Sequence, residues 1–465
     1  MRNFSNHQFL QALRALPSSF RPRVSTSKIL SLALFVCLFL VGNAHAKKGQ
    51  TSLHLNGQPY FPVGVAGAPL DLLGTAPDGG IDFWKMFTEM KNMGMNTFMP
   101  VFLTSEALNT SHDAIYEFLP SECHRRGTST KSGIGALRDS GLSVILPAWT
   151  EVEEASDIML DRPFDEVKAT QSLELFNDCY TGIPILGYQT YDDAPIYDGV
   201  GIPLAKMEQF HRLAKATSPA LNPQVFAVYP TEQEVASMTG GTAQALVELL
   251  KKNFPLYSTA DAADNIGVYS YPIPDRSPAA VGEAVDYVWN FRSSAQRPLV
   301  GLQAFGWRDL TTLSQERRPT AQETYFMACQ AIIHGAGGIV WWGANLIESS
   351  SELWKAIKLT SQALNVLSPW LVQPDSDISV KAPGVETLLK APVGGYSLLL
   401  VVNPSSVPVR TQIMLGAPKP YTIVENLGWG QPPFVTKGSF TRQIEGYGVR
   451  LFLVRFSDTP AYRVS

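Results

Sequence analysis

Two adjacent carboxylates, Asp192 and Asp193, follow the apolar run "PILGYQTY" at residues 184–191. Neighbouring acids repel each other, so ionisation of one raises the pKa of the other. A carboxyl group that stays protonated near neutral pH can donate its proton to a leaving group. The pair therefore predicts general-acid chemistry, and the alternative is that the two side chains cap a helix.

Other acids and aromatic rings also follow apolar runs. Glu151 and Glu232 are candidate catalytic partners of the aspartate pair. The candidate substrate-binding residues, in chain order, are Trp149, Tyr191, Tyr269, Tyr271, Gln303, Trp307 and Trp342. Aromatic rings stack on the C–H faces of a sugar, while carboxylates and amides bind its hydroxyl groups. These residue types together predict a carbohydrate site.

The elements that must bring these residues together are eight short β-like runs separated by helix-sized segments. The runs cover residues 60–65, 95–102, 142–149, 184–191, 224–230, 265–272, 298–305 and 337–344. This alternation predicts a (β/α)₈ TIM barrel, an α/β fold whose active site lies at the C-terminal ends of its strands. An open doubly wound sheet is the alternative, but no GxGxxG turn follows the first run.

The hydrophobic pattern of the sequence changes near residue 373. Short alternating runs punctuated by glycine and proline replace the helical periodicity, which predicts a small all-β sandwich. The helical pattern at 352–371 links the two parts. We expect a signal peptide at 1–46, a barrel domain at 47–372 and an antiparallel β-sandwich domain at 373–465.

The N-terminal region resembles a secretory signal in its layout. The apolar run "ILSLALFVCLFLVG" at 29–42 is preceded by basic residues and followed by "NAHA", which offers small residues for cleavage. The run is shorter than the roughly 20 residues that span a bilayer, so an uncleaved anchor is the less favoured alternative. We expect a secreted or periplasmic protein with no stable membrane span.

Charge and composition exclude several classes of partner. Without residues 1–46 the chain keeps 32 basic and 41 acidic residues, a net charge of −9, which disfavours nucleic-acid binding. The histidines and cysteines show no metal-ligand spacing, so we expect neither a metal nor another cofactor. Cys123 and Cys179 could form a disulfide after export, whereas Cys329 lies in an apolar helical pattern and is expected to be a buried thiol.

Some of the side chains that could bind a ligand or act in catalysis can also be explained by a structural role. Trp341 and Trp342 are adjacent on a predicted strand, so at most one of them can face the barrel interior. Glu323 lies near a predicted helix N-terminus, where a capping role is favoured over catalysis. His334 lies within an apolar helical pattern and is expected to be a core residue rather than a ligand.

Six segments of the chain resemble successive blocks of glycoside-hydrolase-like (β/α)₈ barrels with a C-terminal β-sandwich. The resemblance covers about residues 52 to 372, and the six segments read "NGQPYFPVGV", "MKNMGMNTFMPVF", "GLSVILPAW", "PILGYQTYDDAP", "RPLVGLQAFGW" and "RPTAQETYFMACQAIIHGAGGIVWW". The resemblance implies that Asp193 occupies the place of a glutamate acid/base, with Asp192 before it and Ala194 in place of the usual proline. Families related to the retaining β-glycosidases place a nucleophilic glutamate at the seventh strand, where this chain has Gln303, and a neutral amide cannot serve as that nucleophile.

Three interpretations remain open. In an inverting hydrolase, Asp193 would be the acid and Glu151 or Glu232 the base, with the two carboxyl groups roughly 6.5 to 9.5 Å apart. Some substrate-assisted hexosaminidases, the O-GlcNAcase type among them, carry two neighbouring acids after the fourth strand, and this chain resembles them there. In such an enzyme Asp192 would orient the acetamido group and Asp193 would protonate the leaving oxygen. The expected function is an exported glycoside hydrolase that acts on an oligo- or polysaccharide. The alternative is a non-catalytic carbohydrate-binding or cell-surface barrel.

Overall fold

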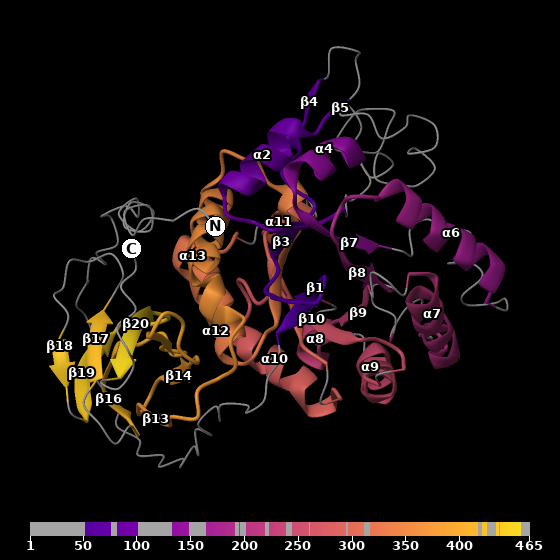
Figure 1. Ribbon diagram of the computed structural model, residues 1–465. Coiled ribbons are helices and arrows are strands. Elements are labelled where there is room, and N and C mark those ends of the chain that lie inside the picture. Colours follow the sequence, from indigo (N-terminus) through magenta and orange to yellow (C-terminus); the bar gives the residue numbers. More distant parts are fainter. Residues whose placement is uncertain are drawn as a thin grey trace.

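The structure is a computed structural model in which a barrel is followed by a group of antiparallel strands (Figure 1). It describes residues 52–75, 81–100, 133–147, 164–190, 195, 201–218, 223–238, 244–259, 261–293, 296–310, 317–416, 421–425, 434–436 and 438–456.

Eight parallel strands close into a barrel, as the alternation of β-like and helical segments predicts. They are β3 (Val63–Ala66), β6 (Thr97–Met99), β7 (Ser143–Pro147), β8 (Ile185–Gln189), β9 (Gln224–Tyr229), β10 (Asn265–Ser270), β11 (Leu299–Gln303) and β12 (Gly338–Trp342). Neighbours in the barrel follow the chain order, and β12 closes the ring by pairing with β3. Strands β8 and β12 are therefore four places apart in a ring of eight and lie on opposite sides of the barrel.

Helices cover the outside of this barrel (Figure 1). Those of four or more residues are α2 (Trp84–Asn92), α4 (Gly133–Ser140), α6 (Glu166–Cys179), α7 (Leu204–Thr217), α8 (Glu232–Met238), α9 (Gln244–Tyr257), α10 (Ala280–Phe291), α11 (Trp307–Leu310), α12 (Ala321–Ile333) and α13 (Glu352–Leu371). Each of the longer helices buries one apolar face against the strands, as Met86, Phe87 and Met90 of α2 do.

A hairpin of β1 (Leu53–Leu55) and β2 (Gln58–Tyr60) closes the N-terminal end of the barrel. Leu53 packs with residues that line the barrel interior, among them Ile145. The Tyr60 hydroxyl lies 3.0 Å from Oγ1 of Thr97 and 2.9 Å from Oγ of Ser143, at the first residues of β6 and β7. The hairpin is thus anchored at the end opposite to the one where a TIM barrel carries its active site.

The C-terminal strands form two antiparallel sheets. One contains β13 (Val380–Lys381), β16 (Val409–Leu415) and β19 (Ser439–Ile444), and the other contains β14 (Glu386–Leu389), β15 (Ser397–Val402), β20 (Val449–Phe456), β17 (Tyr421–Glu425) and β18 (Phe434–Thr436). A separate apolar core joins the two sheets and includes Ile413 from the first and Leu399 and Phe452 from the second.

Strand β15 also connects this β region to the barrel. Successive residues of a strand face opposite sides, so Leu399 and Val401 belong to the core between the sheets, whereas Leu398 and Leu400 belong to the core of the barrel and its helices. Helix α12 lies against this face of the sheet (Figure 1). The two parts therefore share a continuous apolar interface.

The structure tests part of what the sequence predicts about the cysteines and about a membrane span. Cys329 is a free, buried thiol, as predicted. Cys179, the last residue of α6, is disulfide-bonded, and its predicted partner Cys123 lies outside the described residues. The same holds for the expected signal segment at 1–46. Among the helices that the structure describes, none combines the length and the hydrophobicity that crossing a bilayer needs.

Candidate active site

An aromatic cluster occupies the C-terminal end of the barrel on the side of β10, β11 and β12. Tyr269 and Trp342 lie near the ends of β10 and β12, whereas Tyr271 follows β10, and Phe305 and Trp307 follow β11. Tyr269, Tyr271 and Phe305 are buried, whereas Trp307 and Trp342 are partly exposed. The structure thus brings together four of the aromatic residues predicted to bind substrate.

Tyr271 is the centre of this cluster. Its ring stacks on Tyr269 at a centroid distance of 5.0 Å and an interplanar angle of 11°, and on Trp342 at 5.5 Å and 25°. Phe305 meets it edge-on at 5.2 Å. Stacked rings with a partly exposed indole at one end offer an apolar platform at the mouth of the barrel.

Trp341 and Trp342 face opposite sides of β12, as their adjacency requires. Trp341 is completely buried in the core between strands and helices. Trp342 packs with Tyr271 and with residues of the barrel interior. Of the two indoles, Trp342 is therefore the one placed to meet a ligand.

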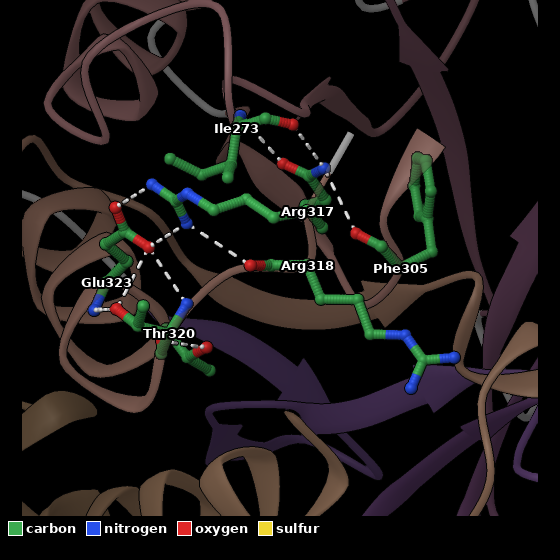
Figure 2. A network of polar contacts seen from close by, with 8 residues as sticks. Ile273, Phe305, Arg317, Arg318, Thr320 and Glu323 are labelled. Carbon is green, nitrogen blue, oxygen red and sulfur yellow. Dashed lines mark hydrogen bonds and ion pairs between the residues drawn. The ribbon is translucent and has the colours of Figure 1, made fainter. Parts of the chain in front are cut away.

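Gln303 connects the segments that follow β10 and β11 through hydrogen bonds to their backbone. Its amide oxygen accepts a hydrogen bond of 3.0 Å from the backbone N–H of Ile273, and its amide nitrogen donates to the carbonyl oxygens of Ile273 at 2.9 Å and of Phe305 at 3.1 Å (Figure 2). The side chain is fully buried. A contact between Gln303 and a substrate stays a prediction, and it would require these bonds to open.

Glu232, a predicted catalytic base, is engaged with the helices outside the barrel. Its Oε2 lies 3.6 Å from Nζ of Lys251 on α9. Its Oε1 accepts a hydrogen bond of 3.4 Å from the hydroxyl of Tyr287 on α10. A catalytic role would require Glu232 to leave both partners.

Glu234, two residues further along α8, is a buried carboxylate that the sequence analysis missed. It is 0% exposed. Its Oε1 accepts a hydrogen bond of 2.7 Å from the backbone N–H of Tyr271, and its Oε2 lies 3.2 Å from Nη1 of Arg276. Burial raises the pKa of Glu234 to about 7 against the opposing effects of the Tyr271 N–H and Arg276. The sequence alone does not tell which of two acids on one short helix faces the core.

Gln189 is a second residue that the sequence analysis did not single out. The preceding residue, Tyr188, points to the helix layer, where its hydroxyl donates to Oδ1 of Asn177 on α6. Because side chains alternate along a strand, Gln189 points into the barrel at the C-terminal end of β8. It is 5% exposed, and its Oε1 has no hydrogen-bond partner in the described part of the chain. A buried acceptor of this kind is a candidate for binding a ligand donor or a water molecule.

Polar contacts join the loops around the aromatic side of the mouth. Arg318 binds Asp309 of α11 through two hydrogen bonds, 2.8 Å from Nε and 2.9 Å from Nη2, and lies 3.0 Å from Oε2 of Glu348 behind β12. Asp71, in the loop behind β3, accepts a hydrogen bond of 2.7 Å from the hydroxyl of Ser349. These contacts connect the loops that follow β11, β12 and β3.

Glu323 has the capping role that its position predicts. Thr320 and Glu323 form a capping box at the start of α12, in which each side chain accepts a hydrogen bond from the other residue's backbone N–H. Both carboxylate oxygens of Glu323 also accept hydrogen bonds of 2.7 Å from the guanidinium of Arg317. Arg317 and Arg318 point in opposite directions (Figure 2), so only Arg318 reaches the loops around the mouth.

The remaining predicted site residues follow β7 and β8. They are Trp149, Glu151, Tyr191, Asp192 and Asp193, and they lie outside the described residues. Their chain positions begin two residues after the last residue of each strand. Within the described ranges, no group of three or more histidine, cysteine or acidic side chains is placed to hold a metal ion.

The barrel with its C-terminal sheets can be compared with known proteins. No protein-family model matches the sequence, and a search of curated proteins finds no match. Solved structures do match. A protein described as a glycoside hydrolase aligns with a TM-score of 0.53 and 11% identity over 88% of this chain and 96% of its own. A family 5 glycoside hydrolase from Bacteroides vulgatus gives a TM-score of 0.53 and 12% identity over 89% and 95%.

A third structure is a family 27 β-L-arabinopyranosidase from Geobacillus stearothermophilus. It aligns with a TM-score of 0.51 and 11% identity over 86% of this chain and 97% of its own. The fold is glycoside-hydrolase-like. At these identities the likeness concerns the arrangement of strands and helices, and it assigns neither a reaction nor a catalytic residue to this chain.

Proposed function

We propose that the protein is a glycoside hydrolase that acts on an oligo- or polysaccharide, with Asp193 as the general acid. The observation that carries the proposal is the ring stack of Tyr271 and Trp342 at the C-terminal mouth of a closed barrel. The segment with Asp192 and Asp193 follows β8, the strand opposite β12. An aromatic wall on one side of the barrel, together with two acids that follow the opposite strand in the chain, suits a sugar ring, which needs an apolar platform and a proton donor.

The role of each acid is assigned from its neighbour in the chain or from the partners that it already binds. In this proposal the negative charge on one of the two neighbouring aspartates raises the pKa of the other, so that the second carboxyl stays protonated for donation. Glu151 is the candidate base for an inverting reaction, because Glu232 is already bound to Lys251 and Tyr287. In a substrate-assisted reaction, Asp192 would instead orient an acetamido group of the sugar. Both routes avoid an enzyme nucleophile on β11.

The proposal includes export. Residues 1–46 would be removed, which leaves a secreted or periplasmic protein that begins near residue 47. The mass of the protein recovered from the extracytoplasmic fraction tests this directly. A product that retains residues 29–42 in a membrane fraction would contradict it.

The activity is tested on purified protein that begins at residue 47. Cellohexaose, xylohexaose and chitohexaose are incubated with the wild type, and the products are followed by chromatography and by NMR of the newly formed anomeric centre. Asp193→Asn should abolish hydrolysis, and Asp192→Asn should reduce it by at least tenfold, whereas Glu352→Gln at the exposed start of α13 should leave it unchanged. A wild-type rate in Asp193→Asn would refute the assignment of the acid.

The binding-only alternative is favoured by one observation. Gln303 stands at the end of β11 as a neutral, fully buried amide whose bonds are made to backbone groups. A barrel that binds glycan without cleaving it needs no carboxylate at this place. Such a protein would bind one of the hexasaccharides in calorimetry, and it would release no product even at high enzyme concentration and long incubation.

A further inference from the structure

The loop that follows β10 carries Tyr271, the central ring of the aromatic cluster. Side chains from two directions bind the backbone of this loop. Gln303 binds the backbone of Ile273 on the β11 side. Glu234 binds the backbone N–H of Tyr271 on the α8 side. We propose that Glu234 is a positioning residue whose ionised carboxylate holds Tyr271 in its stack, and that its protonation loosens the stack.

The geometry explains why the charge matters. Each oxygen of the carboxylate has its own partner, the Tyr271 N–H at 2.7 Å and Nη1 of Arg276 at 3.2 Å. Both are charge-assisted contacts, which are stronger than contacts between neutral groups. A proton on either oxygen removes the charge and occupies one acceptor position. Protonation therefore weakens both contacts at once, the one to Tyr271 and the one to Arg276, which are the two ends of this segment.

Burial, opposed by the nearby charges, places this change near neutral pH. Arg276 is the cation that faces it, and Arg276 also lies 3.8 Å from the exposed Glu283 of α10. On its own helix, Glu232 is paired with Lys251 of α9 and bonded to Tyr287 of α10. Because burial outweighs the help from Arg276, the pKa of Glu234 is raised to about 7. The carboxylate therefore changes its charge near neutral pH.

The consequence for a ligand rests on the proposed function. Trp342 is the partly exposed end of the stack, and Tyr271 is the ring that supports it. When Glu234 is ionised, the platform is held in place and binding costs little further ordering. We therefore expect glycan affinity to be higher above pH 7 than below it.

The first experiment needs no ligand. Near-ultraviolet circular dichroism of the free protein is recorded from pH 5.5 to 8.5, where tyrosine hydroxyls stay protonated. The wild type should show a transition with a midpoint near the pKa of about 7. Glu234→Gln should lack the transition and resemble the acidic form of the wild type at every pH. Glu232→Gln is the matched control on the same helix and should keep the transition.

Two outcomes of this experiment overturn the proposal: a wild type without a transition, or a Glu234→Gln variant that retains it. Should Glu234→Gln fail to fold, Arg276→Gln replaces it. This variant removes the cation that lowers the pKa of Glu234, so the midpoint should move to higher pH. A midpoint that stays in place would equally contradict the proposal.

The second experiment measures binding of cellohexaose, xylohexaose and chitohexaose by calorimetry at pH 5.5 and 8.5. The wild type should bind its preferred hexasaccharide about three- to tenfold more weakly at pH 5.5, and Glu234→Gln should show the weaker affinity at both values. A wild-type pH profile in Glu234→Gln would refute the positioning role. If none of the three sugars binds at either pH, the proposed function falls, and the ligand-free experiment still decides the role of Glu234.

Discussion

Nε2 of His334 lies 2.9 Å from Oε2 of Glu386, so an ion pair joins the end of α12 in the barrel to the first residue of β14. Nδ1 of the same ring lies 2.9 Å from Oδ2 of Asp286 on α10. Burial alone would lower the pKa of His334, but the two carboxylates outweigh it and raise the pKa to about 9. The histidine is buried, as its apolar context predicts, and it acts as a cationic bridge between the barrel and the β region.

The bridge makes stability depend on pH in one direction. Below the unfolded-state pKa of about 6.5, histidine is protonated in both states and the ion pairs contribute in full. As the pH rises through the folded-state value of about 9, this contribution is lost. The free energy of unfolding of the wild type, relative to His334→Gln, should fall by about 1 to 2 kcal/mol between pH 6 and pH 10, allowing for screening of the half-exposed Asp286.

Urea unfolding at a series of pH values measures this difference. His54→Gln, at an exposed position of the N-terminal hairpin, is the control and should follow the wild type at every pH. A constant difference between the wild type and His334→Gln would show that the imidazole packs without carrying charge.

The two tryptophans of β12 offer a matched pair of substitutions. Trp342→Ala removes the partly exposed end of the ring stack, so the affinity for the preferred hexasaccharide should drop at least tenfold, about 1.4 kcal/mol or more. Trp341→Phe acts on the fully buried outer face. It should lower the free energy of unfolding by about 1 to 2 kcal/mol while leaving the affinity unchanged. Calorimetry and urea unfolding of both variants separate the two effects, and equal losses of affinity would count against a role of Trp342 in binding.

Gln189 should matter for binding more than for stability. Gln189→Leu keeps the volume of the side chain and removes an acceptor that has no partner among the described residues, so stability should stay the same or rise by about 1 kcal/mol. If a ligand donor fills the place of that partner, the affinity for the preferred hexasaccharide should fall by about tenfold. An unchanged affinity together with lower stability would instead indicate a structural water at this position.

Arg318 should hold the short helix α11, which begins with Trp307. Arg318→Lys cannot make the two hydrogen bonds to Asp309, whose Oδ2 also accepts from the backbone N–H of Gly306 at 2.7 Å. We expect a loss of about 1 to 3 kcal/mol in stability and greater exposure of Trp307 to fluorescence quenchers. Arg317→Lys is the matched control, because its partner Glu323 lies at the start of α12. This control should not change the quenching of Trp307.

The parts of the fold that the sequence predicts are those with a strong local pattern. Each of the eight barrel strands falls within or across its predicted run, and α13 coincides with the predicted helix at 352–371. Long apolar runs bounded by turn residues and helices leave little freedom in assignment. Glu323 was predictable for the same reason, since a threonine three residues before it completes a local capping motif.

The parts that the sequence did not predict depend on contacts between distant segments. Glu232 and Glu234 share one short helix, and only the packing of that helix on the barrel decides which of them meets the loop of Tyr271. Gln303 was predicted from its position after a strand, but its partners belong to the loop behind the neighbouring strand. Pairings of this kind carry no local pattern and appear only when the barrel closes.

The position of the β1–β2 hairpin determines in which orientation the protein can be immobilised through its N-terminal side. The hairpin is bonded to the first residues of β6 and β7, so Leu53 lies at the floor of the barrel, away from Tyr271 and Trp342. An affinity tag or a chip linker attached shortly before this hairpin would join the molecule at its floor. Immobilised in that way, the protein would present its aromatic wall to the solution, which is the orientation that a surface-based glycan assay requires.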